Sequence, residues 1–212
     1  MNQQGVLADV LRQSIIDGDF APGSRLSESA LAERFDVSRN TLREAFRVLA
    51  EQGLIGHVPH RGVSVAAPTI ADVIDIYRVR RIIECTTLRQ CEPEHPAVQS
   101  MRDALTEAEH HLVNKEWRRV GSANMAFHTA IIALADSPRL ARTYRNLAAE
   151  LRLAFLEIDD PRALHEPFVR KNHAVLEALE NEGPGAAADA LEKYLVSSER
   201  LVLGAFARMS KE

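Results

Sequence analysis

Three arginines recur every four residues between positions 39 and 47. Arginine is the side chain best suited to hold phosphate groups and guanine edges. On a helix, the spacing of Arg39, Arg43 and Arg47 places all three on one face. Apolar residues fall on another face of the same helix, at Leu42, Ala45, Phe46 and Leu49. A helix with one side for a core and one side for an anionic partner fits the major groove of DNA.

The elements around this helix must position it, and their pattern predicts a winged helix-turn-helix. A one-sided helix is expected at 6–17, and a short helix capped by Ser27 is expected to end near residue 35. Ser38 can cap the arginine helix, and Gly53 stands where that helix should stop. Extended segments at 54–58 and 63–66 then flank a turn that contains Pro59 and Gly62. Three helices followed by a two-stranded hairpin make residues 1–66 a winged DNA-binding domain.

The rest of the chain is expected to be a second, all-helical domain. Residues 67–69 read as a short linker, after which no further strand signal appears. Helices are expected at about 70–91, 97–114, 116–135, 138–157, 162–182 and 185–208. Six helices within residues 70–212 predict an antiparallel bundle, so the fold class is mainly α.

The composition limits the possible function classes. The 212 residues carry a formal net charge of −4, and residues 1–66 hold seven Arg and no Lys against eight Asp and Glu. Contact with DNA would therefore depend on where the arginines stand and not on total charge. No segment has the length of a membrane span or the form of a leader, and we expect a cytoplasmic protein without membrane contact. No nucleophile elbow or P-loop is present, so we expect neither an enzyme nor a cofactor.

Residues 6–66 resemble the winged helix of the GntR family of transcriptional regulators. The resemblance includes the pattern I-x-x-G-x-[FY]-x-P-G-x-x-L at residues 15–26. It continues through Leu31-Ala32-Glu33, Val37-Ser38-Arg39, Leu42-Arg43-Glu44-Ala45 and Arg61-Gly62. By motif position, the resemblance implies that Arg39 and Arg43 contact bases and phosphates of double-stranded DNA.

The same resemblance implies further DNA contacts around these two arginines. Ser38, Asn40 and Thr41 would supply contacts at the start of the helix, where short polar groups and the helix dipole suit phosphate oxygens. Arg47 would contact DNA or would instead pair with Glu44 or Glu51. His60, Arg61 and Gly62 would form the tip of the wing in the minor groove, unless His60 and Arg61 are plain turn residues.

The helical bundle is similar to the FadR-like effector domain of that family, the FCD domain. The similarity lies in Asp75-Ile76-Tyr77, in the run from Arg80 to Glu84, and in Phe127-His128. The count of six helices points to the shorter, VanR-like branch. Members of this group are homodimers that bind palindromic operators and respond to a small organic acid. The resemblance therefore implies a regulator, most often a repressor, with an effector site inside the bundle.

Many FadR-like domains hold a divalent metal through an aspartate and three histidines, and this chain departs from that pattern. The corresponding positions read Asn124, His128, Asn172 and Tyr194, while His173 stands one residue out of register. Two amides and a phenol are poor metal ligands, so we expect no metal.

Those four side chains could instead line a polar site that binds the effector directly, or they could be ordinary interior polar groups. Arg80 and Arg81 are adjacent, so only one of them can face the interior of the bundle. The register favours Arg80, whose guanidinium could hold a carboxylate through two hydrogen bonds. One alternative stays open at this point. The chain could be a constitutive DNA-binding dimer whose bundle only dimerises and senses no ligand.

Overall fold

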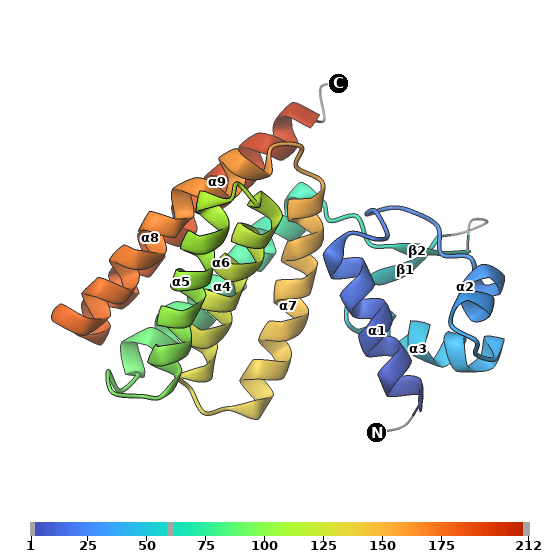
Figure 1. Cartoon of the computed structure of the whole chain (residues 1–212), viewed down its shortest axis with the longest axis horizontal. Coiled ribbons are helices and arrows are strands. Elements are labelled where there is room, and N and C mark those ends of the chain that lie inside the picture. Colours follow the sequence, from blue (N-terminus) through green and yellow to red (C-terminus); the bar gives the residue numbers. More distant parts are fainter. Residues whose placement is uncertain (1–2, 59–61, 210–212) are drawn as a thin grey trace. The chain divides into compact units, whose positions relative to one another are not determined.

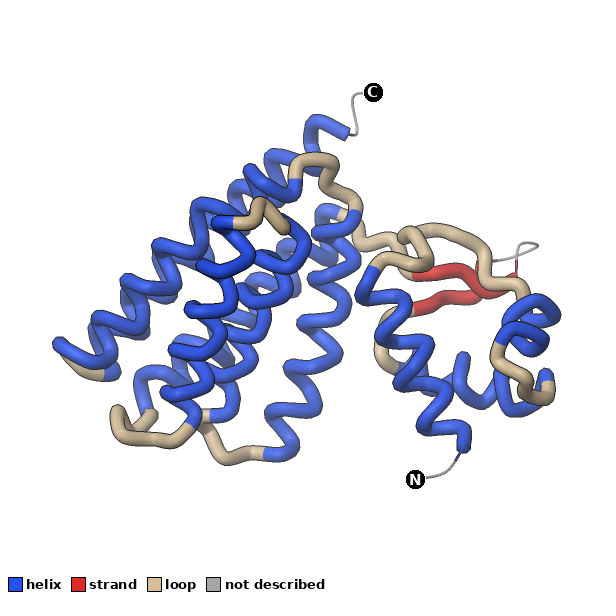
Figure 2. The backbone as a smooth tube through the Cα atoms, in the orientation of Figure 1, coloured by secondary structure: helices blue, strands red, loops and turns tan. Residues whose placement is uncertain are grey.

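The computed structural model describes residues 3–58 and 62–209, most of which are helical (Figures 1 and 2). In chain order the elements are α1 (Gln3–Asp17), α2 (Glu28–Arg34), α3 (Arg39–Glu51), β1 (Ile55–Val58), β2 (Gly62–Val65), α4 (Ile70–Gln90), α5 (Ala97–Val113), α6 (Trp117–Ala133), α7 (Pro138–Leu156), α8 (Pro161–Asn181) and α9 (Pro184–Met209). The mainly α fold class is confirmed. Helices α4 to α9 begin and end within two residues of the bounds expected from the sequence. In the described ranges, no helix is long and apolar enough to cross a membrane.

The chain divides into two compact units. One unit contains the residues up to 69 together with 149–157, and the other contains 70–148 and the residues from 158 onward. The division predicted from the sequence, at residues 67–69, assigns 149–157 to the bundle and stays a prediction.

The first unit is a winged helix-turn-helix whose core forms around α3. Leu42 and Leu49 on the apolar face of α3 are fully buried, and α3 packs against α1. Ser38 caps α3, because its Oγ accepts a hydrogen bond from the backbone N–H of Thr41 at 3.0 Å. Apolar spacing and a capping serine therefore fix both the start of α3 and the face that it buries.

Strands β1 and β2 form the antiparallel hairpin of the wing. Their register runs from Ile55 opposite Val65 to Val58 opposite Gly62. Gly62 has a φ of +82°, a left-handed conformation that glycine adopts without steric strain. The turn between the strands, with the predicted contact residues His60 and Arg61, lies outside the described residues.

The second half of α7 contributes to the core of this first unit. Ala149 and Leu153 are buried in the same hydrophobic cluster as the leucines of α1 and α3. The buried Arg152 donates a hydrogen bond from Nε to the backbone carbonyl of Ile16, at 3.2 Å. Residues 149–157 are thus part of the unit that holds the winged helix.

The second unit is a helical bundle in which α4 packs on α9, α5 on α6, and α8 on both α6 and α9 (Figure 1). Tyr77, Phe127 and Ile131 are among its fully buried side chains. Helices α6 and α8 approach closely at Gly121, where an added Cβ would overlap the ring of the buried His165. Any larger residue at this position would force that histidine ring to move.

Candidate functional site

Helix α3 presents Arg39, Arg43 and Arg47 to solvent, and we call these three residues the arginine face. Nε of Arg43 donates a hydrogen bond to Glu28 of α2 at 2.9 Å, so α2 orients this guanidinium. Nη1 of Arg47 lies 3.5 Å from a carboxylate oxygen of Glu44, one of the two pairings left open by the sequence. Among the residues that the structure describes, Arg39 has neither a hydrogen-bond nor an ion-pair partner. The arginine face therefore offers one guanidinium without a partner among the described residues and two that are paired with half-buried carboxylates.

The first turn of α3 adds polar groups beside the arginine face. Asn40 is exposed, and the hydroxyl groups of Ser38 and Thr41 lie 2.8 Å apart. The free N–H groups and the positive end of the helix dipole point in the same direction, as in phosphate sites at helix starts. This end of α3 is suited to a polyanion.

The interior of the bundle contains a set of charged and polar side chains from α4, α6 and α7. We call Arg80, Glu84, His128 and Tyr144 the buried charge cluster; all four are buried. Nε of Arg80 donates to one oxygen of Glu84 at 2.6 Å, and Tyr144 donates its hydroxyl proton to the same oxygen at 2.9 Å. Nδ1 of His128 donates to the other oxygen at 2.7 Å. A fully buried carboxylate thus sits at the centre of three donors.

The surroundings of each group in this cluster fix its charge. Burial opposes ionisation of Glu84, but Arg80 and His128 favour it more strongly, so the pKa of Glu84 falls from 4.5 to about 2. Burial lowers the pKa of His128, and the positive charge of Arg80 adds to that effect. Burial and the charge of Glu84 raise the pKa of Tyr144 well above its ordinary value. At neutral pH the cluster therefore holds one cation, one anion, a neutral imidazole and a neutral phenol.

A chain of amide hydrogen bonds lies one helical turn before His128. Asn124 donates from Nδ2 to the backbone carbonyl of His165 at 3.2 Å. Asn172 of α8 donates from Nδ2 to Oδ1 of Asn124, also at 3.2 Å. Both asparagines are buried. The amides are thus fixed to each other and to the backbone of α8.

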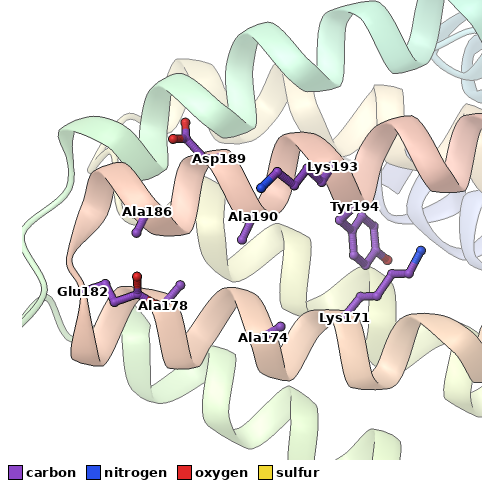
Figure 3. Close-up of a pocket in the computed structure, with 9 residues that line it drawn as sticks. All are labelled: Lys171, Ala174, Ala178, Glu182, Ala186, Asp189, Ala190, Lys193 and Tyr194. Atoms are coloured by element: carbon purple, nitrogen blue, oxygen red, sulfur yellow. The ribbon is translucent and has the colours of Figure 1, made fainter.

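Tyr194 of α9 borders both this interior and the outside of the bundle. Its ring centroid lies 4.8 Å from that of His128, in an edge-on arrangement. Tyr194 also lines a groove of about 530 Å³ between α8 and α9, beside Lys171 and Lys193 (Figure 3). Burial raises the pKa of the Tyr194 hydroxyl, which stays neutral. This side chain separates the polar interior from an open groove.

The five effector-site residues expected from the sequence are all buried in the bundle: Arg80, Asn124, His128, Asn172 and Tyr194. The structure brings Arg80 and His128 together on the carboxylate of Glu84, and it places Tyr194 against the ring of His128. Arg81 points elsewhere and pairs with Glu199 at 2.5 Å.

Sequence reasoning missed Glu84 and Tyr144 as members of this site. Glu84 had a signal, because it follows Arg80 by four residues and therefore shares its helix face. Tyr144 had none, because it reaches Glu84 from a helix 60 residues further along the chain.

The positions that hold a metal in many related domains do not fit one in this chain. Asn124 is engaged through both atoms of its amide, which leaves one imidazole nitrogen, one amide oxygen and a neutral phenol. Zinc and similar ions require about four ligands, with thiolate, imidazole or carboxylate among them. Within the described ranges, no group of three or more His, Cys, Asp or Glu could hold a metal ion.

The fold and these two sites define a class of protein, a DNA-binding transcriptional regulator with a helical effector-binding domain. Residues 3–65 match the family of bacterial regulatory proteins named gntR, and residues 75–197 match the FCD domain. The chain belongs to the GntR family and carries an FCD domain. Proteins of this family regulate transcription and are not enzymes.

Named relatives agree with this assignment. The HTH-type transcriptional repressor RspR of Escherichia coli strain K12 is 29% identical over 92% of this chain and 86% of its own length. The HTH-type regulator BphR of Paraburkholderia xenovorans strain LB400 is 31% identical over 78% of this chain and 73% of its own length. A solved structure of a GntR transcriptional regulator from Rhodococcus sp. RHA1 is 37% identical, with a TM-score of 0.92 over 97% of this chain and 99% of that chain.

Proposed function

We propose that this chain acts in the cytoplasm as a homodimeric repressor, binds a palindromic operator, and changes its operator affinity when a small organic acid binds. The operator-binding part of this proposal rests on the arginine face of the capped helix α3. Each subunit would place α3 in the major groove of one half-site. Ser38, Asn40 and Thr41 would hold phosphates there, and His60, Arg61 and Gly62 would approach the minor groove.

Arg39 is the residue on which this assignment depends most, because its guanidinium has no hydrogen-bond or ion-pair partner within residues 3–58 and 62–209. Arg39→Ala should weaken operator binding by about 1–3 kcal/mol, the usual value of a bidentate arginine–base contact. The probe is a DNA duplex selected from a random library by the parent protein and titrated by fluorescence anisotropy at fixed salt. Arg118→Ala removes the same charge from an exposed position on α6 and should leave the affinity unchanged. Equal affinity of the Arg39 variant and the parent would contradict the role of α3.

The dimer half of the proposal rests on the family assignment and on α4. Ile82 of α4 is 63% exposed, which is unusual for a large apolar side chain in a helix that otherwise packs well. A second copy of the chain covering this face would bury it and bring two winged helices, one for each half-site, into one molecule.

The effector half rests on the FCD domain and on the buried polar groups. Arg80, Asn124, His128, Asn172 and Tyr194 would line the site. Because Arg80 already pairs with Glu84, a carboxylate of the effector would share Arg80 with Glu84 or replace it there. Binding would repress or release transcription only if the operator-bound and free forms differ in affinity for the acid.

The test of this half repeats the operator titration in the presence of single carboxylic acids. A shift in operator affinity with one acid, reduced by Arg80→Gln, is the expected result. Unchanged affinity with every acid would instead favour the constitutive dimer, whose bundle serves only to dimerise.

A further inference from the structure

The orientations of Asn124 and Asn172 follow from one main-chain carbonyl group. The carbonyl of His165 can only accept hydrogen bonds, so Asn124 must present Nδ2 to it. Oδ1 of Asn124 then faces Asn172, which must donate through its own Nδ2. Oδ1 of Asn172 is the atom left over. It is buried and has no hydrogen-bond partner among the described residues.

His128 is fixed in the same way by Glu84. The carboxylate only accepts, so Nδ1 of His128 carries the hydrogen. Because Arg80 already balances the charge of Glu84, a protonated His128 would be a second buried cation without a counter-charge. Nε2 of His128 therefore presents a lone pair. It too is buried and unpartnered within the described part of the chain.

Both atoms are thus hydrogen-bond acceptors without a donor, and Asn124 lies between the residues that carry them, one turn from His128 on α6 and bonded to Asn172. A buried acceptor without a donor is costly, and a ligand donor that pairs with it gains affinity accordingly. We infer that the effector site of this chain recognises a hydrogen-bond donor, a hydroxyl or ammonium group, which pairs with Nε2 of His128 and Oδ1 of Asn172. This inference rests on the proposed effector response and narrows the ligand to a hydroxy acid or an amino acid.

Tyr194 lies between these acceptors and a groove that opens to solvent. It contacts the ring of His128 on one side and lines the groove between α8 and α9 on the other. Figure 3 shows Lys193 beside Tyr194 on α9 and Lys171 on the neighbouring helix α8. Lys193 is exposed and has no ion-pair partner in residues 62–209. An acid that enters through this groove would pass the lysines before its carboxylate reaches Arg80 and its donor group reaches the two acceptors.

The test compares acids that differ only in the donor group. One set is propanoate, lactate and alanine, and a second set is succinate, malate and aspartate. Binding to the full-length chain is measured by isothermal titration calorimetry. In at least one set, the hydroxy acid or the amino acid should bind at least tenfold more tightly than the unsubstituted acid. The hydroxyl and ammonium members separate the two possible donors.

A matched pair of variants shows whether the preference arises at His128. His128→Asn keeps a side-chain N–H close to the position of Nδ1 and removes Nε2, so the donor preference should disappear. His173→Asn makes the same replacement one residue after Asn172, about 100° around α8, and should keep the preference. ¹⁵N-NMR of histidine-labelled protein gives a second readout. Nε2 of His128 should resonate as an unprotonated nitrogen and should move when the preferred acid is added.

The outcomes separate this inference from the function on which it rests. Equal binding within both sets, or a donor preference that persists in His128→Asn, overturns the inference and leaves the effector response in place. A protonated Nε2 in the free protein, or a Zn²⁺ or Mn²⁺ titration that perturbs it without any acid, also overturns the inference. If no acid of either set binds while the operator is still bound, the effector half of the proposed function fails with it.

Discussion

At the scale of single residues, Glu84 carries a full negative charge in the middle of the bundle and depends on its three donors. An isolated buried carboxylate would take up a proton, but Arg80, His128 and Tyr144 hold this one ionised. The pair of Arg80 and Glu84 need not stabilise the fold more than apolar residues would, yet removal of one partner leaves the other charge unpaired. The cluster therefore fixes the relative positions of α4, α6 and α7.

The negative charge of Glu84 makes the stability of the bundle depend on pH. The pKa of Glu84 is lower in the folded chain, about 2, than its ordinary value of 4.5. The contribution of ionised Glu84 to the free energy of unfolding is therefore complete above about pH 4.5 and is lost as the pH falls toward 2. Linkage between protonation and folding puts this contribution at roughly 3 kcal/mol. The fluorescence of Trp117, the single tryptophan, follows unfolding of the bundle in urea at each pH.

Glu84→Gln is the control for this pH dependence. It should destabilise the bundle by about 3–5 kcal/mol at pH 7, because Arg80 loses its counter-charge. Between pH 4.5 and 2, the free energy of unfolding of the variant should also fall much less than that of the parent. An identical acid profile in parent and variant would show that other carboxylates govern the acid transition.

At the scale of elements, Gly121 allows α6 and α8 to approach and places Asn124 beside the backbone of His165. Gly121→Ala should destabilise the bundle by about 1–3 kcal/mol, because the added Cβ would overlap the ring of His165. Gly204→Ala is the matched control in α9, where the added Cβ would lie 3.7 Å from the end of the Arg208 side chain. That change should be neutral or stabilise the helix by up to about 1 kcal/mol. Urea unfolding of both variants checks the difference, and equal stabilities would contradict the tight contact.

The elements themselves could be predicted from the sequence, because their signals are local. Apolar periodicity and capping serines mark α2 and α3, and prolines or glycines mark most of the ends of the bundle helices. The connections within the buried site could not be predicted in full. The contact between Glu84 and Tyr144 depends on tertiary packing, and nothing local distinguishes Tyr144 from an ordinary buried tyrosine. For the same reason, periodicity identified α7 but gave no sign that residues 149–157 pack in the core of the winged helix.

At the scale of the whole molecule, the proposed homodimer can be tested at Ile82. Ile82→Arg should shift the chain from dimer to monomer in sedimentation equilibrium, because a charge would be buried at the subunit interface. The free monomer should keep its fold, since Ile82 is 63% exposed. Val113→Arg alters a side chain that is 81% exposed at the end of α5 and should leave the dimer intact. If the Ile82 variant remains dimeric, the interface lies on another face.

Helix α7 has a consequence for communication between the two functions. It places Tyr144 in the buried charge cluster of one compact unit and Leu153 in the hydrophobic core of the other. Leu153 follows Tyr144 by nine positions, or about 13 Å along an α-helix at 1.5 Å per residue. An effector that alters the hydrogen bond from Tyr144 to Glu84 would therefore act on the helix whose later residues belong to the core around α3.

A less stable α7 should weaken the effect of the effector on operator affinity, while the chain still binds both the effector and the operator. Ala148→Gly, between Tyr144 and Leu153, should bring the ratio of operator affinities with and without effector closer to one, because glycine lowers helix stability by about 1 kcal/mol. Ala141→Gly, an exposed position before Tyr144 in the same helix, should keep the full ratio. In that case the backbone of α7, and not a chain of side-chain contacts, would couple the buried charge cluster to the winged helix.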